Sequence, residues 1–251
     1  MAKTPADFVF FWKPDQPYGW AGQWYPSPFT ARVTLHDDEE RDVFFPTAEH
    51  WMMAQKALLF GDKDIFERIA GPPLVSGAST SPNQSEGAGP RRSKRSRPSK
   101  TASASPAQAS PKKHRAPSPK EVKALGRKVK NFDEATWVRE RTRIVLEGTL
   151  HKFRQNPDLR RELLATGEKE MVEASPLDRV WGIGMGEKKA LETCGSAEGR
   201  EAWGLNLLGR ALGEAREVLR AEFRDEGEGE GEGEGEGIDG GGVATETLRS
   251  G

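Results

Sequence analysis

The chain has 251 residues, of which only 35% are hydrophobic, and it contains 28 Gly and 17 Pro. Two stretches, 72–118 and 225–251, consist mostly of Ser, Pro, Ala, Gly and charged residues. Such a composition buries too little apolar surface to offset the entropy of ordering the chain. We therefore predict one folded domain in two parts, 1–71 and 119–224, interrupted by a disordered basic insertion at 72–118 and followed by a disordered acidic tail at 225–251.

The net charge of −1 hides two opposite biases. The insertion holds nine Lys or Arg against Glu86 alone, and the tail holds nine acids against Arg249. The folded part is therefore nearly neutral, which argues against a globally basic nucleic-acid binder. The basic clusters at 91–97 and 112–115 could instead bind an import receptor, tether the protein to nucleic acid, or form a solvated insertion without a role.

Cysteine and histidine usage limits the kind of site. Cys194 is the only cysteine, so an intrachain disulfide and a multi-cysteine zinc site are excluded. The four histidines lack metal-ligand spacing, and we expect neither a metal nor another cofactor. No apolar stretch reaches the ~18 residues of a membrane span, and no apolar run follows a basic start at the N-terminus. We expect a soluble protein of the cytoplasm or nucleus with no membrane association.

The first folded part predicts strands followed by helices. The apolar run 8–12 indicates a buried strand, and alternation over 31–35 with a return at 43–45 indicates a hairpin. Thr47 as N-cap and Glu49 in the first turn predict a helix from there to about residue 60. A second helix should run from residue 62 or 63 to residue 70.

Helix signals dominate the second folded part. A capping box of Ser118 and Glu121 predicts a helix directly after the insertion, and Asp133 caps a long helix that ends before Pro157. Another helix should cover 156–166, and 171–174 suggest a short strand. The last helix carries an apolar stripe with helical spacing: Leu205, Leu208, Leu212, Ala215 and Leu219. The predicted fold class is mainly α with a small N-terminal β-sheet (α+β), without a phosphate-loop or dinucleotide-binding glycine signature.

Glu49 and Lys56 are candidates for chemistry because of their spacing. Seven residues apart on a helix, they lie on nearly the same face, about 10 Å apart along the axis. Met52 and Met53 between them would desolvate the lysine, lower its pKa and make the neutral amine nucleophilic. The alternative is that Glu49 only favours the helix N-terminus and that Lys56 is a surface lysine.

Two further features allow a functional and a structural interpretation. Asp178, before a Gly-rich turn at 182–186, could face a pocket approached by backbone amides, but an Asx turn or a helix cap explains it equally well. The aromatic stretch 18–29 could stack on a base, or its rings could belong to the core.

Several segments, taken together and in order, resemble the NADAR domain, the YbiA-like family. They include YGWAGQWYPSPF at 18–29, FPTAEHWMMAQKA at 45–57, LGR at 125–127 with Trp137, KF at 152–153, LATG at 164–167, DRVWGIG at 178–184 and GLNLLG at 204–209. The resemblance spans almost all of the predicted folded part.

The resemblance implies a mostly helical domain that cleaves N-glycosidic bonds. The substrates it implies are phosphoribosylamino-pyrimidines of the early riboflavin pathway or ADP-ribosylated guanine in nucleic acid. It also implies that Lys56 attacks C1 of the ring-opened ribose to form a Schiff base, with Glu49 and Asp178 as acidic partners. A non-catalytic module that binds ADP-ribose or a related nucleotide is the alternative.

The candidate substrate-binding residues follow from the aromatic stretch and from the matched motifs. They are Trp20, Gln23, Trp24, Arg127, Trp181, Gly182, Gly184 and Asn206. The guanidinium of Arg127 suits a phosphate.

Two positions depart from the family pattern. Gln23 stands where many relatives have Asn, so contacts to the base could differ. Gly213 stands at a methionine position of the last helix, where glycine costs about 1 kcal/mol relative to alanine and should leave a gap.

Overall fold

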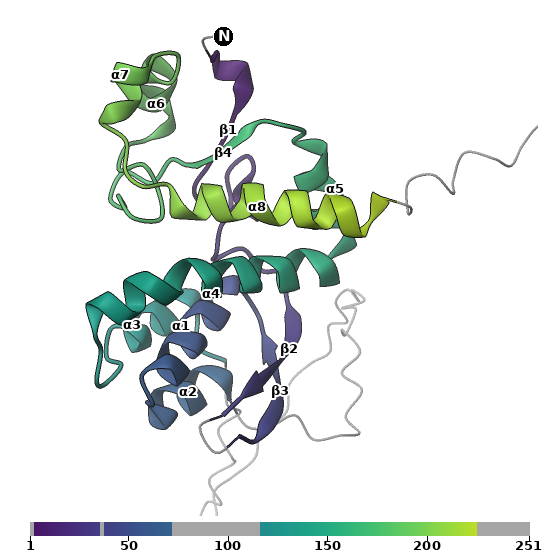
Figure 1. Cartoon of the computed structure of the whole chain (residues 1–251), viewed down its shortest axis with the longest axis vertical. Coiled ribbons are helices and arrows are strands. Elements are labelled where there is room, and N and C mark those ends of the chain that lie inside the picture. Colours follow the sequence, from purple (N-terminus) through teal and green to yellow (C-terminus); the bar gives the residue numbers. More distant parts are fainter. Residues whose placement is uncertain (1–2, 36–37, 72–115, 225–251) are drawn as a thin grey trace, which may run out of the picture.

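The computed structural model describes residues 3–35, 38–71 and 116–224 (Figure 1). Its strands are β1 (Phe8–Phe11), β2 (Phe29–Thr34), β3 (Glu40–Phe45) and β4 (Glu170–Glu173). Its α-helices are α1 (Ala48–Leu59), α2 (Lys63–Ala70), α3 (Pro119–Gly126), α4 (Glu134–Gln155), α5 (Pro157–Ala165), α6 (Glu187–Thr193), α7 (Ala197–Glu201) and α8 (Leu207–Glu222). Short 3-10 helices occur at Pro5–Asp7 and Gly19–Ala21. The predicted fold class, mainly helical with little sheet, is confirmed.

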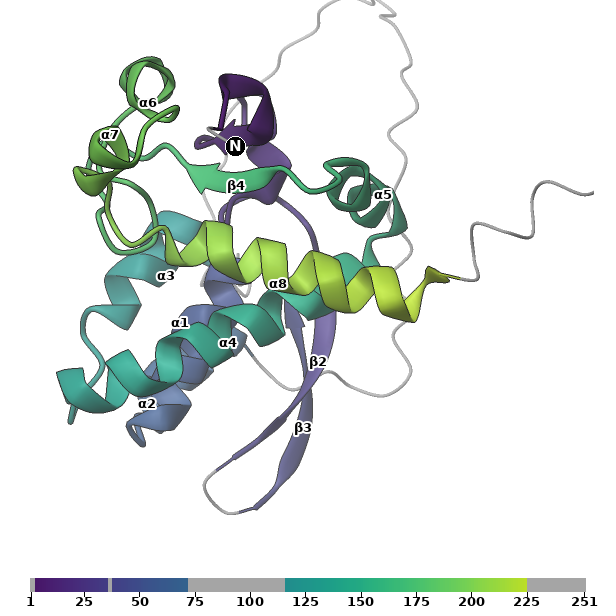
Figure 2. The same cartoon turned by 45° about the horizontal axis from the view of Figure 1, so that its top comes forward.

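Helices α4 and α8 lie side by side through the middle of the molecule (Figures 1 and 2). On the α4 side lie α1, α2, α3 and the β2–β3 hairpin. On the α8 side lie β1, β4 and α5 to α7. Helix α1 contacts α2, α3 and α4, and most of its residues are buried. It is therefore a central helix on the α4 side of the molecule.

The small sheet is in fact two separate two-stranded sheets. β2 and β3 form the predicted antiparallel hairpin, in which Phe29 pairs with Phe45. β1 instead pairs in parallel with β4, and Phe8 lies opposite Glu170. A parallel pair requires a long crossover, and here most of the helices lie within it.

Most helix starts agree with the capping signals. Ser118 and Glu121 form the predicted capping box of α3, and the Asp133 carboxylate accepts the Thr136 N–H at 2.7 Å at the start of α4. Thr47 occupies the N-cap position of α1, but its hydroxyl bonds the Nδ1 of His50 at 2.8 Å instead of a backbone N–H.

In the last part of the chain, two helices were not predicted and one predicted helix position was wrong. Helices α6 and α7 were not predicted, because they have only 7 and 5 residues and too few apolar positions for a periodic pattern. Leu205 is not part of the buried stripe of α8: it precedes the helix and is 48% exposed, whereas the stripe is buried from Leu208 onward.

Gly213 on α8 has room beside it for a side chain. A Cβ placed there meets no heavy atom within 4 Å outside its neighbours, so the site is open. Gly213→Ala should therefore raise the free energy of unfolding by about 1 kcal/mol, through helix propensity alone. Urea denaturation measures it. Gly148→Ala on α4 is the matched control and should destabilise, because its Cβ would lie 2.3 Å from the Trp51 ring. A loss of stability in Gly213→Ala would contradict the prediction.

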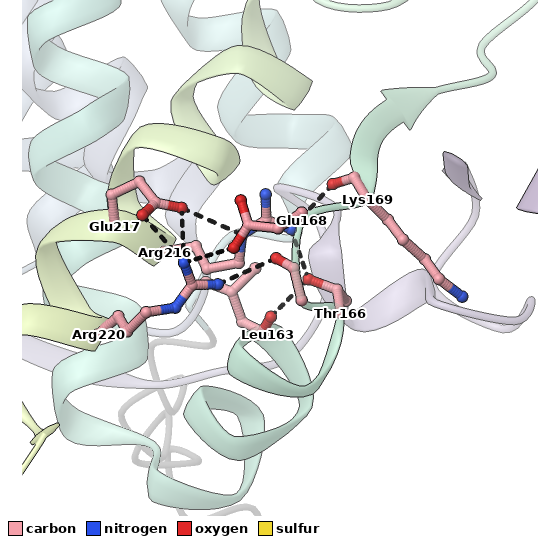
Figure 3. Close-up of polar contacts among 8 residues, drawn as sticks. Leu163, Thr166, Glu168, Lys169, Arg216, Glu217 and Arg220 are labelled. Atoms are coloured by element: carbon pink, nitrogen blue, oxygen red, sulfur yellow. Dashed lines mark hydrogen bonds and ion pairs between the residues drawn. The ribbon is translucent and has the colours of Figure 1, made fainter. Parts of the chain in front are cut away.

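A buried arginine fastens α8 to the turn that follows α5 (Figure 3). Arg216 is 5% exposed and donates to the Thr166 hydroxyl at 2.7 Å and to the Lys169 carbonyl at 2.9 Å. Next to it, Arg220 bridges Glu168 and Glu217 (Figure 3). The cluster closes the carbonyl end of α5 against α8.

The predicted insertion up to residue 115, with both basic clusters, and the predicted tail lie outside the described residues. The boundaries of the four segments therefore stay predictions. Residues 116–118 are described, and they lead directly into α3. Within the described ranges, no helix combines the length and the apolar character that a membrane crossing requires.

Candidate active site

A pocket of about 330 Å³ opens between α1, α3, α4 and the loop after β4. This volume is within the range of small-molecule sites. Its lining residues are Met52, Met53, Lys56, Lys123, Gly126, Arg127, Phe132, Glu134, Trp137, Arg141, Asp178, Val180 and Trp181. The pocket thus combines aromatic rings with four cations and two carboxylates.

Helical spacing explains why these side chains converge. On α3 and its C-cap, Gly126 and Arg127 lie three and four residues after Lys123. On α4, Trp137 lies three residues after Glu134, and Arg141 lies four residues after Trp137. Residues at such spacings share one face of a helix. Each helix therefore turns one short face toward the pocket.

Lys56 is half-buried in this pocket. Its Nζ lies 4.2 Å from the centroid of the Phe132 ring and 5.2 Å from that of Trp137. Burial lowers the pKa of the Lys56 amine, and the nearby Glu134 carboxylate partly opposes this. A lowered pKa increases the neutral fraction, which is the nucleophilic form of an amine.

Glu49 does not line the pocket but lies behind it, in the first turn of α1. Its backbone N–H donates to the Gln23 carbonyl at 3.0 Å, and its side chain is almost fully buried. Burial raises the pKa of the Glu49 carboxyl to about 7, although Lys123, the Trp24 side chain and Arg127 act in the opposite direction. The Glu49 oxygen Oε1 has no hydrogen-bond partner among the described residues. Near neutral pH this group can hold or release a proton.

Asp178 lies in the loop that follows β4. It lines the pocket, and its Oδ1 accepts the N–H groups of Val180 at 2.9 Å and Trp181 at 2.8 Å. The sequence left an Asx turn and a pocket carboxylate open as alternatives, and Asp178 has both features. Its negative charge also raises the pKa of Glu49, so the two carboxylates lie within electrostatic reach.

Glu173 is a further acid that the sequence reasoning missed. Burial raises its pKa to about 7, and the charges of Asp178 and Glu49 add to this. Its Oε2 has no hydrogen-bond partner among the described residues. A signal was available: an acid ends the apolar strand β4, five residues before Asp178.

The predicted binding residues divide into two groups. Arg127 and Trp181 line the pocket, whereas Trp20, Gln23, Trp24, Gly182, Gly184 and Asn206 are not among its lining residues. The pocket also contains Lys123, Phe132, Glu134, Trp137 and Arg141, which were not named as candidate site residues. Their helical spacing was visible in the sequence, but which helix faces meet was not.

Gly182, Gly184 and Asn206 support the loop instead of lining the pocket. A Cβ on Gly182 would lie 2.6 Å from the Glu173 carbonyl oxygen, and Gly184 has a φ of +72°. The Asn206 amide donates to the Met171 carbonyl at 2.8 Å and accepts the Glu173 N–H at 3.1 Å. Both polar atoms of the Asn206 side chain bond the backbone of β4, which places this side chain between α8 and β4 and not among the residues that line the pocket.

The aromatic stretch lies behind Glu49. Trp20 packs edge-on against Phe153, at 6.0 Å between ring centroids. Trp24 is 37% exposed, and the Nζ of Lys123 lies 5.8 Å from the centroid of its ring. The oxygen Oε1 of Gln23 is buried without a hydrogen-bond partner among the described residues. The stretch therefore contacts the site from the side of Glu49.

Similarity to known proteins extends over most of the chain. A family model described as the NADAR domain matches residues 10–89 and 98–220. The chain is 34% identical over 196 residues to N-glycosidase R617 of Acanthamoeba polyphaga mimivirus, an alignment that covers 78% of this chain and 84% of the relative. It is 28% identical to N-glycosidase Npun_R5314 of Nostoc punctiforme, over 84% of this chain and 92% of the relative.

A more distant relative and a solved structure complete the comparison. The chain is 23% identical to the riboflavin biosynthesis protein VVA0006 of Vibrio vulnificus, over 84% of this chain and 38% of that protein. The NMR structure of the E. coli protein YbiA superimposes with a TM-score of 0.50 and 22% identity, covering 90% of each chain. This likeness supports the fold.

Proposed function

Because the chain belongs to the NADAR domain family, we propose that its pocket hydrolyses an N-glycosidic bond to ribose. The chain is a hydrolase acting on N-glycosyl bonds, the class named for its mimivirus and Nostoc relatives. The single observation that carries the proposal is the position of Lys56: an amine with a lowered pKa in the same pocket as the Asp178 carboxylate.

Lys56 is the proposed nucleophile. Opening of the sugar ring makes C1 an iminium carbon, still joined to the amino nitrogen of the base. The neutral Nζ then adds to C1, the bond from C1 to the base nitrogen breaks, and the base leaves as the free amine with one added proton. Water hydrolyses the resulting lysine imine, which returns the amine and releases the sugar as an aldehyde.

The two acids supply proton transfer and charge stabilisation. With a pKa of about 7, Glu49 is the proposed source of the proton for the departing base. The backbone N–H groups of Val180 and Trp181 both donate to Oδ1 of Asp178 and hold its side chain in place. As a carboxylate it stabilises the positive charge that develops at C1.

Cations around the pocket favour a phosphorylated substrate. Arg127 and Arg141 come from different helical segments, and the guanidinium group of neither forms a hydrogen bond or ion pair with another described residue. One guanidinium group can donate two parallel hydrogen bonds to the oxygens of a phosphate. The aromatic rings of Trp137 and Trp181 provide flat apolar surface for a base. These features are compatible with the two substrates that the family resemblance implies, so the proposed substrate is a phosphoribosylamino-pyrimidine or ADP-ribosylated guanine.

Product analysis on both substrates tests this proposal. The protein is incubated with a phosphoribosylamino-pyrimidine and, separately, with an oligonucleotide carrying ADP-ribosylated guanine, and the released base is quantified by chromatography. We expect turnover of one substrate class. Tight binding of ADP-ribose without release of any base would instead identify a binding module.

A further inference from the structure

Lys152 on α4 is a buried amine that the proposed reaction does not use. The residue is 2% exposed, and it does not line the pocket. Its Nζ donates to two backbone carbonyls, that of Trp20 at 2.6 Å and that of Gly22 at 3.0 Å. No carboxylate among the described residues forms an ion pair with it. Its lack of access to the pocket excludes it as the nucleophile.

Burying this amine is unfavourable by itself. Transfer of an ammonium group out of water costs several kcal/mol unless hydrogen bonds replace its hydration. Burial lowers the pKa of the Lys152 amine to about 7, which reflects this cost. Methionine would fill much of the same volume without it. The two hydrogen bonds of the Lys152 Nζ offset part of this cost and tie α4 to the carbonyls of Trp20 and Gly22.

The main chain of segment 18–25 forms few other long-range hydrogen bonds within the described residues. Its backbone hydrogen bonds, such as Ala21 N–H to the Tyr18 carbonyl, join residues three apart. Tyr18 adopts a left-handed φ of 56°, so the segment cannot continue a regular strand or helix. Among the described residues, the long-range hydrogen bonds to its main chain come only from Lys152 and from Glu49.

The segment in turn holds the acid of the site. The Gln23 carbonyl accepts the Glu49 N–H at 3.0 Å. The Trp24 side chain also acts on the Glu49 carboxyl, whose pKa it lowers, and the Nζ of Lys123 lies 5.8 Å from the centroid of the Trp24 ring. A continuous series of contacts therefore leads from Lys152 through the segment to Glu49.

We infer that Lys152 is a positioning residue of the active site, which fixes segment 18–25 so that Gln23 and Trp24 orient the Glu49 carboxyl. The expected effect on the reaction rate rests on the proposed function, whereas the effect on Trp24 does not. Arg216 provides a matched comparison: it is also a buried cation that donates to a backbone carbonyl, but its contacts lie on α8 and near α5.

The test compares Lys152→Met with Arg216→Met in the full chain. The seven tryptophans are labelled with 5-fluorotryptophan, and the ¹⁹F resonance of Trp24 is assigned by its loss in Trp24→Phe. In Lys152→Met we expect the Trp24 resonance to shift or broaden and kcat to fall about 10- to 100-fold, with KM changed less than about threefold. Arg216→Met should lose stability but keep the Trp24 resonance and kcat of the parent.

The outcomes separate the two proposals. An unchanged Trp24 resonance in folded Lys152→Met, or a kcat matching that of Arg216→Met, would overturn the positioning role. If the parent turns over neither substrate while the Trp24 resonance responds, the proposed function fails and the positioning role stands.

A second variant covers the case in which Lys152→Met does not fold. Lys152→Gln keeps a donor on a shorter side chain. The changes in the resonance and in kcat should then be smaller but in the same direction, and the effect of Trp24→Phe on kcat should be weaker in the Lys152→Gln background than in the parent. Additive effects would contradict the inference.

Discussion

Replacing Lys56 with alanine or with arginine should lower turnover at least about 1,000-fold. Alanine removes the nucleophile. Arginine keeps a positive charge next to the Phe132 and Trp137 rings, but its guanidinium stays protonated and cannot form an imine. Equal losses in the two variants would therefore separate nucleophilic catalysis from simple charge stabilisation.

Borohydride trapping measures the same step directly. Reduction during turnover should attach the ribosyl fragment to the parent, and peptide mass spectrometry should locate it on Lys56. Lys120→Ala, which removes an exposed lysine of α3 outside the pocket, should leave trapping and turnover unchanged. An adduct that persists in Lys56→Ala, or full activity in that variant, would refute the assignment.

Replacing Glu49 with glutamine should change activity and stability in opposite directions. Loss of the proton donor should lower kcat about 100- to 1,000-fold. Because burial raises the pKa of the Glu49 carboxyl from 4.5 to about 7, the folded state binds the proton more tightly than the unfolded state. This contribution to stability is complete below about pH 4.5 and is lost as the pH rises through about 7. Above pH 7 the uncharged glutamine should therefore stabilise the fold, by about 3 kcal/mol.

Urea denaturation at pH 5 and at pH 8 measures the stability effect. The gain in Glu49→Gln should appear at pH 8 and be largely absent at pH 5. Glu162→Gln, at an exposed position of α5, should show no such pH dependence. In the parent, kcat should also fall as the pH rises above about 7. A variant equally stable at both pH values relative to the parent, or one with full activity, would contradict the role of Glu49.

The sequence identified the residues whose chemistry is visible locally. Lys56, Asp178, Arg127 and Trp181 were named and line one pocket, since their motifs fall at the ends or on the faces of elements whose caps and periodicity are clear. The pairing of β1 with β4 was beyond local patterns, because neither four-residue strand specifies a partner so distant along the chain.

Lys152 shows a different limit of sequence reasoning. In a 22-residue helix rich in charged residues it resembles any surface lysine. Its hydrogen-bond partners are the backbone carbonyls of Trp20 and Gly22. Because every residue has a backbone carbonyl, no pattern of residue types predicts these hydrogen bonds. Asn206 illustrates the reverse: its motif suggested a ligand contact, but its amide is committed to β4.

The parallel pairing of β1 with β4 also bears on how the protein is made. A ribosome synthesises the chain from its N-terminal end, so β1 cannot pair with β4 until Glu170, the partner of Phe8, has been synthesised. Asp178 and Trp181, which complete the pocket, emerge later still. Nascent chains that stop before this point expose the apolar strand β1 and lack a finished catalytic cleft, so any glycosidase activity arises only once synthesis has passed the β4 loop.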